Sequence, residues 1–251
     1  MAETKVEQHS SPVYNGKAIP CWTESGKEYL LLQKFPHLQK RFHSGMDCLE
    51  AEERSSLHAL IRLREEELRT REDYSTVLHH KVSLLAGGNL AHVETDAVVN
   101  ASNHWLSAGK GVNGAIHSAA GDCLLEQCLS LGGCEAGQAK ITSGYNLPAS
   151  YVIHTVGPEG RDKERAPLLR SCYESSLSLL LAHNLRSIAF PCVSTGVYRY
   201  PCVEAGDVAL RCVRAWLLEH PQAVDRVVFV TRTARNEEVY SKLMLAYFPL
   251  N

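Results

Sequence analysis

Short runs of β-branched and apolar residues alternate with helical patterns from residue 81 onward. The predicted strands are 81–85, 96–100, 138–144, 151–156, 187–191 and 226–231. Helical patterns fall between or after them, at about 112–131, 164–183, 203–218 and 236–247. Strands that alternate with helices of this length are typical of an α/β domain, in which helices cover both faces of a mainly parallel sheet. We therefore place an α/β domain at residues 81–251.

The first 80 residues have a different pattern. Residues 1 to about 25 are polar and rich in turn formers, and we interpret them as a tail. Residues 46–72 carry apolar side chains close to helical spacing, which predicts an amphipathic helix, although Leu63 lies off the apolar stripe and Arg64 interrupts it. The alternating Glu and Arg residues of this segment are most simply a solvated outer face. The sequence thus predicts a tail and a helical extension, residues 1–80, before the α/β domain.

Composition limits the class of protein and its partners. The chain has 251 residues, of which 45% are hydrophobic and 22% are charged, as in ordinary globular proteins. A formal net charge of −2 at pH 7 provides no basic field for a long phosphate backbone, so we expect no nucleic-acid partner. The sequence contains no run of about 18 apolar residues, so we expect no transmembrane helix and no membrane partner.

The cysteines and the first residues bear on location. Nine cysteines are scattered without a Cys-x-x-Cys pair, and the first residues lack the apolar core of a secretory signal. We therefore expect reduced thiols and an intracellular location, either cytoplasmic or nuclear. The N-terminal stretch contains acidic residues and no arginine, which argues against a mitochondrial address but leaves that location open.

Two glycine-bearing loops follow predicted strands. One is GKGVNGAIHSAAG at residues 109–121, and the other is PCVSTGVYRYP at residues 191–201. In parallel sheets ligands bind outside the carboxyl ends of strands, where a glycine loop that opens a helix directs backbone N–H groups at an anion. The arrangement suits a diphosphate without a lysine cluster. Taken alone, the first loop fits a tight strand-to-helix connection equally well, and it matches neither the P-loop nor the Gly-x-Gly-x-x-Gly pattern.

A metal site has no support from local spacing. No His-x-x-x-His or His-Glu-x-x-His pattern occurs, and Cys123, Cys128 and Cys134 lack zinc spacing. Free cysteines of this kind are usually small buried apolar side chains. His154 is most simply a strand histidine satisfied by a neighbour. We therefore expect no metal site.

Other polar side chains suggest catalysis only weakly. His117 lies four residues after Asn113 and can share its helix face, but packing against the domain is its simpler role. Ser194 is not part of a Gly-x-Ser-x-Gly motif and resembles a phosphate-loop residue instead. A serine nucleophile is therefore not expected.

Taken together, these segments resemble the macrodomain family, specifically the MacroD-type ADP-ribosyl hydrolases. The resemblance covers about 81–248 and is carried by DAVVNASN (96–103), GKGVNGAIHSAAG (109–121), GCEAGQAKITSGYNLPASYVIHTVGP (133–158) and AFPCVSTGVYRYP (189–201). It implies a three-layer α/β/α sandwich with a mixed, mainly parallel sheet. It also implies a site for ADP-ribose and no cofactor.

The resemblance assigns residues to that site. The diphosphate would lie between the two glycine loops, Asn103 would hold the distal ribose, and Tyr198 would cover that ribose. Catalysis is assigned to Asn103, Asn113 and Tyr198. The implied ADP-ribose contacts are Asn89, Leu90, Asn100, Asn103, Gly109, Lys110, Gly111, Val112, Asn113, Ser194, Thr195, Gly196, Val197, Tyr198 and Arg232.

Three residues depart from the MacroD pattern. Asn113 stands where the family has an aspartate proposed to position or deprotonate water, and an amide cannot act as a base; general-base help is typically worth about 10²–10⁴-fold. Asn89 stands near the acid that accepts from the adenine amine, and its neutral oxygen is a weaker acceptor. Arg232 stands where relatives often carry an aromatic side chain near the adenine. A guanidinium can stack there, but a solvated arginine at a strand end is equally expected.

The resemblance therefore implies a metal-independent hydrolase, which we expect to be monomeric. It would remove mono-ADP-ribose from acidic side chains of proteins and hydrolyse O-acetyl-ADP-ribose, because both substrates are esters of the distal ribose. The alternative is a reader that binds ADP-ribose or ADP-ribosylated proteins without turnover, which Asn113 favours. A macrodomain for RNA or poly-ADP-ribose is disfavoured by the lack of basic composition.

Overall fold

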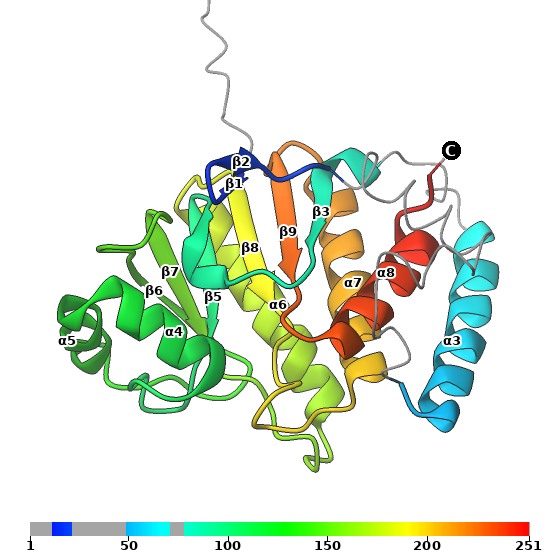
Figure 1. Ribbon diagram of the computed structural model, residues 1–251, viewed down its shortest axis with the longest axis horizontal. Coiled ribbons are helices and arrows are strands. Elements are labelled where there is room, and N and C mark those ends of the chain that lie inside the picture. The colour runs from blue at the N-terminus through cyan, green and yellow to red at the C-terminus, as the bar shows by residue number, and fades with distance from the viewer. Residues whose placement is uncertain (1–11, 22–48, 71–77, 251) are drawn as a thin grey trace, which may run out of the picture.

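A six-stranded sheet forms the centre of the protein (Figure 1). The computed structural model describes residues 12–21, 49–70 and 78–250. The strand order is β3-β9-β8-β5-β7-β6, and all neighbours are parallel except β6, which runs antiparallel to β7. The bounds are β3 Val82–Leu85, β5 Ala97–Ala101, β6 Ala139–Ser143, β7 Tyr151–Thr155, β8 Ser187–Pro191 and β9 Arg226–Val230. The predicted mixed, mainly parallel sheet is confirmed, and each predicted strand lies within a residue or so of an observed one.

Helices cover both faces of this sheet, because its central strands carry apolar side chains on both sides. In β5, Ala97 and Val99 pack into one hydrophobic core, and Val98 packs into a second core on the opposite face. The first core is closed by α6 (Arg165–Ala182), α7 (Cys202–Glu219) and α8 (Ala234–Tyr247), and the second by α4 (Gly111–Ala120) and α5 (Asp122–Ser130). The three-layer α/β/α sandwich is therefore confirmed.

The helical pattern predicted at about 112–131 forms two separate helices, α4 and α5. Gly121 lies between them with φ of +85°, a left-handed conformation that glycine adopts at little cost, and its N–H donates to the carbonyl of His117 to end α4. Asp122 then begins α5, where an acidic side chain is favourable near the helix N-terminus. The apolar pattern runs across this break, which is why periodicity alone did not reveal it.

The N-terminal segments are joined to the domain. Helix α3 (Ala51–Arg69) lies within the predicted segment 46–72, and its Leu57 and Leu68 side chains are buried in the core that α7 and α8 share. Leu63, off the predicted stripe, is 54% exposed. Because α3 packs mainly on α8, it belongs to the hydrophobic core of the α/β domain. The domain boundary at residue 80 stays a prediction.

Arg64 departs from the predicted solvated face of this helix. Its guanidinium donates two hydrogen bonds to the carboxylate of Asp207 on α7, at 2.8 and 2.9 Å, and the Tyr247 hydroxyl of α8 also donates to that carboxylate. The side chains of Arg64 and Asp207 are 13% and 8% exposed. Burial and the neighbouring Asp207 raise the pKa of Tyr247, so its hydroxyl stays protonated. One carboxylate therefore ties together α3, α7 and α8.

The interpretation of residues 1–25 as a tail is wrong for part of the segment. Strands β1 (Val13–Tyr14) and β2 (Lys17–Ala18) form a hairpin, and β1 pairs with β4 (Val93–Glu94). Asn15 and Gly16 form the turn with φ of 49° and 73°. Asn-Gly is a strong hairpin signal, and it was present in the sequence. Residues 1–11 and 22–25 lie outside the described residues.

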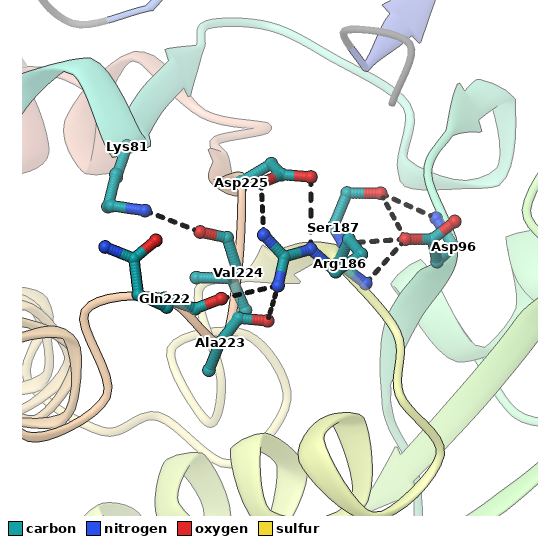
Figure 2. A network of polar contacts seen from close by, with 8 residues as sticks. All are labelled: Lys81, Asp96, Arg186, Ser187, Gln222, Ala223, Val224 and Asp225. Carbon is teal, nitrogen blue, oxygen red and sulfur yellow. Dashed lines mark hydrogen bonds and ion pairs between the residues drawn. The ribbon is translucent and has the colours of Figure 1, made fainter. Parts of the chain in front are cut away.

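A polar network fixes the amino ends of the central strands (Figure 2). The Asp96 carboxylate accepts from the backbone N–H groups of Arg186 and Ser187, at 2.7 and 2.8 Å, and from the Ser187 hydroxyl at 3.0 Å. The Arg186 guanidinium donates to the Asp225 carboxylate and to two backbone carbonyls. Lys81 donates to the carbonyl of Val224 at 2.7 Å. These contacts hold β5, β8 and β9 together at the end opposite to the glycine loops.

Two further expectations concern the cysteines and membranes. All eight cysteines in the described residues are free, and five of them are buried. Burial raises the pKa of Cys172 to about 11 and that of Cys212 to about 12, so these thiols act as small apolar side chains.

Among the described helices, none is both long and apolar enough to span a bilayer.

Candidate functional site

A cavity of about 1040 Å³ opens at the carboxyl ends of β5, β8 and β9. Its walls come from the two glycine loops, from the segment that precedes β4, and from the first residues of α4, α7 and α8. The polar network shown in Figure 2 lies at the opposite, amino ends of the same strands. The cavity therefore lies where an α/β sheet usually binds its ligand.

The structure brings nearly all the predicted site residues to this cavity. Fourteen of the fifteen line it, and they come from four separate stretches of the chain. They are Asn89, Leu90, Asn103, Gly109, Lys110, Gly111, Val112, Asn113, Ser194, Thr195, Gly196, Val197, Tyr198 and Arg232.

Asn100 is the exception, because it lies beneath the cavity wall. Its side chain is fully buried, and its amide nitrogen donates to Asn113 Oδ1 at 2.9 Å and contacts His154 Nδ1 at 3.1 Å. The last residues of β5 point alternately to the two faces of the sheet, so Asn100 faces the α4 side while the chain beyond it turns into the cavity. The expected ADP-ribose contact of Asn100 is corrected to a supporting contact with Asn113.

Two asparagines organise the first glycine loop through one carbonyl. The amide nitrogens of Asn103 and Asn113 both donate to the carbonyl of Ser107, at 2.8 and 2.9 Å. Asn103 Oδ1 in turn accepts from the backbone N–H groups of Trp105 and Ser107. An amide nitrogen carries two hydrogens. Each asparagine therefore keeps one N–H for a ligand or water, while its oxygen is already engaged within the protein.

The glycines of this loop serve two needs. Gly111 has φ of +64°, a conformation that other residues rarely adopt. Gly114 lies against the loop backbone, and a Cβ placed on it would come within 2.4 Å of the Gly109 carbonyl oxygen. The glycines thus let the loop turn sharply and pack closely on the first turn of α4.

The N-terminus of α4 presents unpaired backbone donors. Lys110 is the N-cap residue and its side chain makes no capping hydrogen bond. The N–H groups of Gly111, Val112 and Asn113 have no acceptor in the described part of the chain. Uncapped N–H groups and the positive end of the helix dipole favour an anion at this position.

The second glycine loop presents a similar group of backbone N–H donors. Ser194 and Arg199 have φ of 65° and 54°, and the N–H groups of Arg199 and Tyr200 donate back to carbonyls of the same loop. Within residues 78–250, the N–H groups of Gly196, Val197 and Tyr198 have no acceptor. Since residues 111–113 and 196–198 line one cavity, two groups of backbone donors are available to one elongated anion.

Other wall residues were missed at the sequence level. Glu53 from α3 lines the cavity together with Arg235 from α8, and these two side chains form an ion pair. Asn236 also lines it and donates to the Thr195 hydroxyl at 3.2 Å, which fixes the second loop to α8. Arg232 lies nearby at the end of β9 and is exposed. Glu53 is 35 residues from the nearest other lining residue, Gly88, so no local motif reveals it.

Tyr198 lines the cavity on the second glycine loop. It is half-buried at the rim, and burial, with a smaller effect from Glu159, raises the pKa of its hydroxyl. The hydroxyl therefore stays protonated at neutral pH and acts as a hydrogen-bonding group. It does not act as a base.

Comparison with known proteins bears on this cavity. The Macro domain family matches residues 99–209, which include both glycine loops. ADP-ribose glycohydrolase MACROD1 of Mus musculus is 49% identical over 176 residues, covering 69% of this chain and 54% of that protein. A Macro domain-containing protein of Ralstonia nicotianae is 51% identical over 147 residues, covering 58% of this chain and 84% of that protein. The match thus spans about half the length of the mouse relative.

A solved structure agrees in fold as well as sequence. The macrodomain of Trypanosoma brucei in complex with ADP-ribose superposes with a TM-score of 0.63 at 44% identity. The match covers 68% of this chain and 72% of that one.

Proposed function

Because this chain belongs to the macrodomain family, we propose that it is an ADP-ribosyl hydrolase. Its substrates are mono-ADP-ribose on acidic side chains of proteins and O-acetyl-ADP-ribose. The relatives named ADP-ribose glycohydrolase and the related macrodomain in complex with ADP-ribose support this proposal.

The observation that carries the proposal is the pair of backbone donor groups in one cavity. Residues 111–113 and 196–198 line the same cavity, and their backbone N–H groups have no acceptor within the described residues. A diphosphate is an elongated dianion that accepts from both groups at once, so it needs no lysine cluster. A cavity of about 1040 Å³ is also large enough for a whole dinucleotide-sized ligand.

The distal ribose is placed against Asn103 and Tyr198. The remaining N–H of Asn103 donates to a ribose hydroxyl, and the Tyr198 ring covers the sugar. Because Asn103 is already held by Ser107 and Trp105, it is oriented before the ligand arrives. Such preorganisation lowers the cost of binding.

Asn113 positions water and does not deprotonate it. Its Oδ1 accepts from Asn100, and one hydrogen of its Nδ2 is donated to Ser107, so only one N–H remains. That N–H donates to a water and holds it near the ester. The water oxygen attacks the acyl carbon of the ester while a phosphate oxygen of the substrate takes its proton. The bond from that carbon to the ribose oxygen then breaks, and the ribose oxygen takes up the proton, so the chemistry is substrate-assisted.

The first test is release of ADP-ribose from defined substrates. We expect release from a protein modified on glutamate and from O-acetyl-ADP-ribose, because both are ribose esters. We expect no release from proteins modified on serine or arginine, whose linkages to the ribose are not esters. The free ADP-ribose that is released under single-turnover conditions is measured by chromatography. Absence of release from every substrate, with ADP-ribose still bound, would support the reader.

Substitution of Asn113 separates positioning from base catalysis. Asn113→Ala is expected to lower the single-turnover rate about tenfold, because only water orientation is lost. Asn113→Asp is expected to raise the rate by adding a carboxylate beside the water. It is also expected to weaken ADP-ribose binding, since the new oxygen faces both the Ser107 carbonyl and the diphosphate. Rates on the glutamate-modified protein and the affinity for ADP-ribose are measured together.

Two variants control this experiment. Asn146→Asp introduces the same change at an exposed site away from the cavity and is expected to alter neither quantity. Asn103→Ala is expected to reduce binding and rate together, because it removes the ribose contact. If wild type shows no release and Asn113→Asp alone creates it, the natural protein is a reader built on a hydrolase frame.

The reader is the second candidate for a specific reason. Asn113 lacks the basicity of a carboxylate, and its oxygen is occupied by Asn100. Against the reader, the first glycine loop keeps its donors and holds its two asparagines in fixed orientations. Binding alone does not require Asn113 to be oriented, so we favour the hydrolase.

A further inference from the structure

Three side chains that are distant in sequence meet beside the first glycine loop. They are His117 of α4, Cys128 of α5 and His154 of β7, and one potential ligand atom from each lies within 4.8 Å of the others. Cys128 Sγ lies 3.6 Å from Nε2 and 3.9 Å from Nδ1 of His154. All three side chains are buried. We propose that they form a binding site for one zinc-type metal ion.

The donor set and its spacing suit such an ion. Thiolate and imidazole are the ligands that Zn²⁺ and Co²⁺ prefer. A tetrahedral zinc site with ordinary bond lengths has sulfur and nitrogen ligands about 3.5 Å apart. Cys128 Sγ lies 3.9 Å from His154 Nδ1, a little farther than this value, so a metal ion that binds both atoms draws the two side chains slightly together.

His154 is already oriented as a metal ligand. Its Nε2 lies 2.8 Å from Thr142 Oγ1, whose hydroxyl is directed to the Val152 carbonyl at 3.5 Å, so Nε2 carries the hydrogen and donates to Thr142. Nδ1 is therefore the acceptor and faces the Asn100 amide at 3.1 Å. Metal-binding histidines commonly donate their second ring N–H in this way. A metal ion on Nδ1 takes the place of the Asn100 N–H.

His117 supplies the independent observation. It is 7% exposed, and neither of its ring nitrogens has a hydrogen-bond partner in the described part of the chain. Buried polar atoms in native proteins are nearly always paired, so two unpaired nitrogens on one ring need an explanation. A metal ion bound by one of them supplies that partner.

Metal binding at this cluster involves the exchange of one proton. The thiolate is the form of cysteine that binds a metal ion. Binding therefore forms the metal–sulfur bond and releases the Cys128 proton to solvent.

The three residues of this cluster are too far apart in the sequence to form a recognisable metal-binding motif. Cys128 lies 11 residues after His117 and His154 lies 26 residues after Cys128, so no zinc motif results. The turn at Gly121 folds α5 back on α4, and β7 lies beneath both. The sequence-based expectation of no metal site considered only ligands that are close along the chain.

The test uses the full chain, freed of metal with a chelator and kept reduced. Co²⁺ alone is titrated and followed by absorption. We expect saturation at one equivalent, with a thiolate-to-cobalt band in the near ultraviolet and tetrahedral cobalt bands in the visible. Excess Zn²⁺ is expected to abolish these bands. No thiolate band in the wild-type protein at one equivalent overturns the proposal.

Variants assign the site. Cys128→Ser is expected to lose the thiolate band, and His117→Gln to weaken Co²⁺ binding at least tenfold. Two control variants are expected to keep the band. Cys123→Ser replaces an exposed cysteine, and Cys172→Ser replaces a buried cysteine outside the cluster. A band that survives Cys128→Ser, or that disappears in Cys123→Ser, overturns the proposal. Circular dichroism checks folding, and if Cys128→Ser does not fold, the result for His117→Gln decides.

Discussion

Replacement of Gly196 by Glu is expected to abolish ADP-ribose binding without unfolding the protein. Gly196 lines the cavity in the second donor loop, and a Cβ built on it meets no other described atom within 4 Å. The glutamate side chain therefore fits and extends its carboxylate toward the proposed diphosphate site. Two like charges about 4 Å apart repel by about 4 kcal/mol at an effective dielectric constant of 20. We expect the affinity to fall by at least about 100-fold.

Calorimetry with ADP-ribose measures this effect, and circular dichroism verifies the fold. Ser178→Glu, on the exposed side of α6, is the matched control, because it adds the same charge far from the two donor loops. It is expected to leave the affinity unchanged. An unchanged affinity in Gly196→Glu would place the diphosphate elsewhere and contradict the proposed binding mode.

The largest loss of stability is expected from Asp207→Ala. This change leaves the Arg64 guanidinium largely buried without its main partner, and the Tyr247 hydroxyl loses its acceptor. Removing one member of a buried ion pair costs about 3–5 kcal/mol, because the other charge stays desolvated. We expect a decrease of about this size in the free energy of unfolding, measured by urea denaturation.

Glu67→Ala is the control for this measurement. Glu67 also pairs with Arg64, but its side chain is 48% exposed, and exposed ion pairs contribute about 0–1 kcal/mol. A loss below about 1 kcal/mol in Asp207→Ala would mean that the two side chains are solvated, contrary to their burial.

The parts of the fold that depend on local pattern could be predicted. Strand β8 occupies the predicted residues, because its apolar run is short, follows the charged Arg186 and ends at Pro191. The two glycine loops were also visible in sequence, as runs of glycine and small residues that directly follow predicted strands. Fourteen predicted residues share one cavity because the carboxyl ends of parallel strands lie at one edge.

The remaining features depend on contacts between distant segments. Asn100 was assigned to the ligand, but whether the last residues of a strand face the cavity or the helix layer depends on packing. Arg64 looked solvated because its partner, Asp207, is 143 residues away. Glu53 and the cluster of His117, Cys128 and His154 were not predicted for the same reason, because their neighbours in space are distant in sequence. Composition and periodicity describe neighbours along the chain, and they carry no information on these pairings.

The ion pair between Glu53 and Arg235 has a consequence for how macrodomains diversify. Both residues line the cavity, yet both lie outside residues 99–209, the stretch that matches the family. The donor loops therefore lie inside the matched stretch of the sequence, whereas this part of the cavity wall lies outside it. Evolution can change one without touching the other. Two proteins with the same matched stretch can thus diverge in the ligands they select through segments that a comparison of that stretch alone would never register.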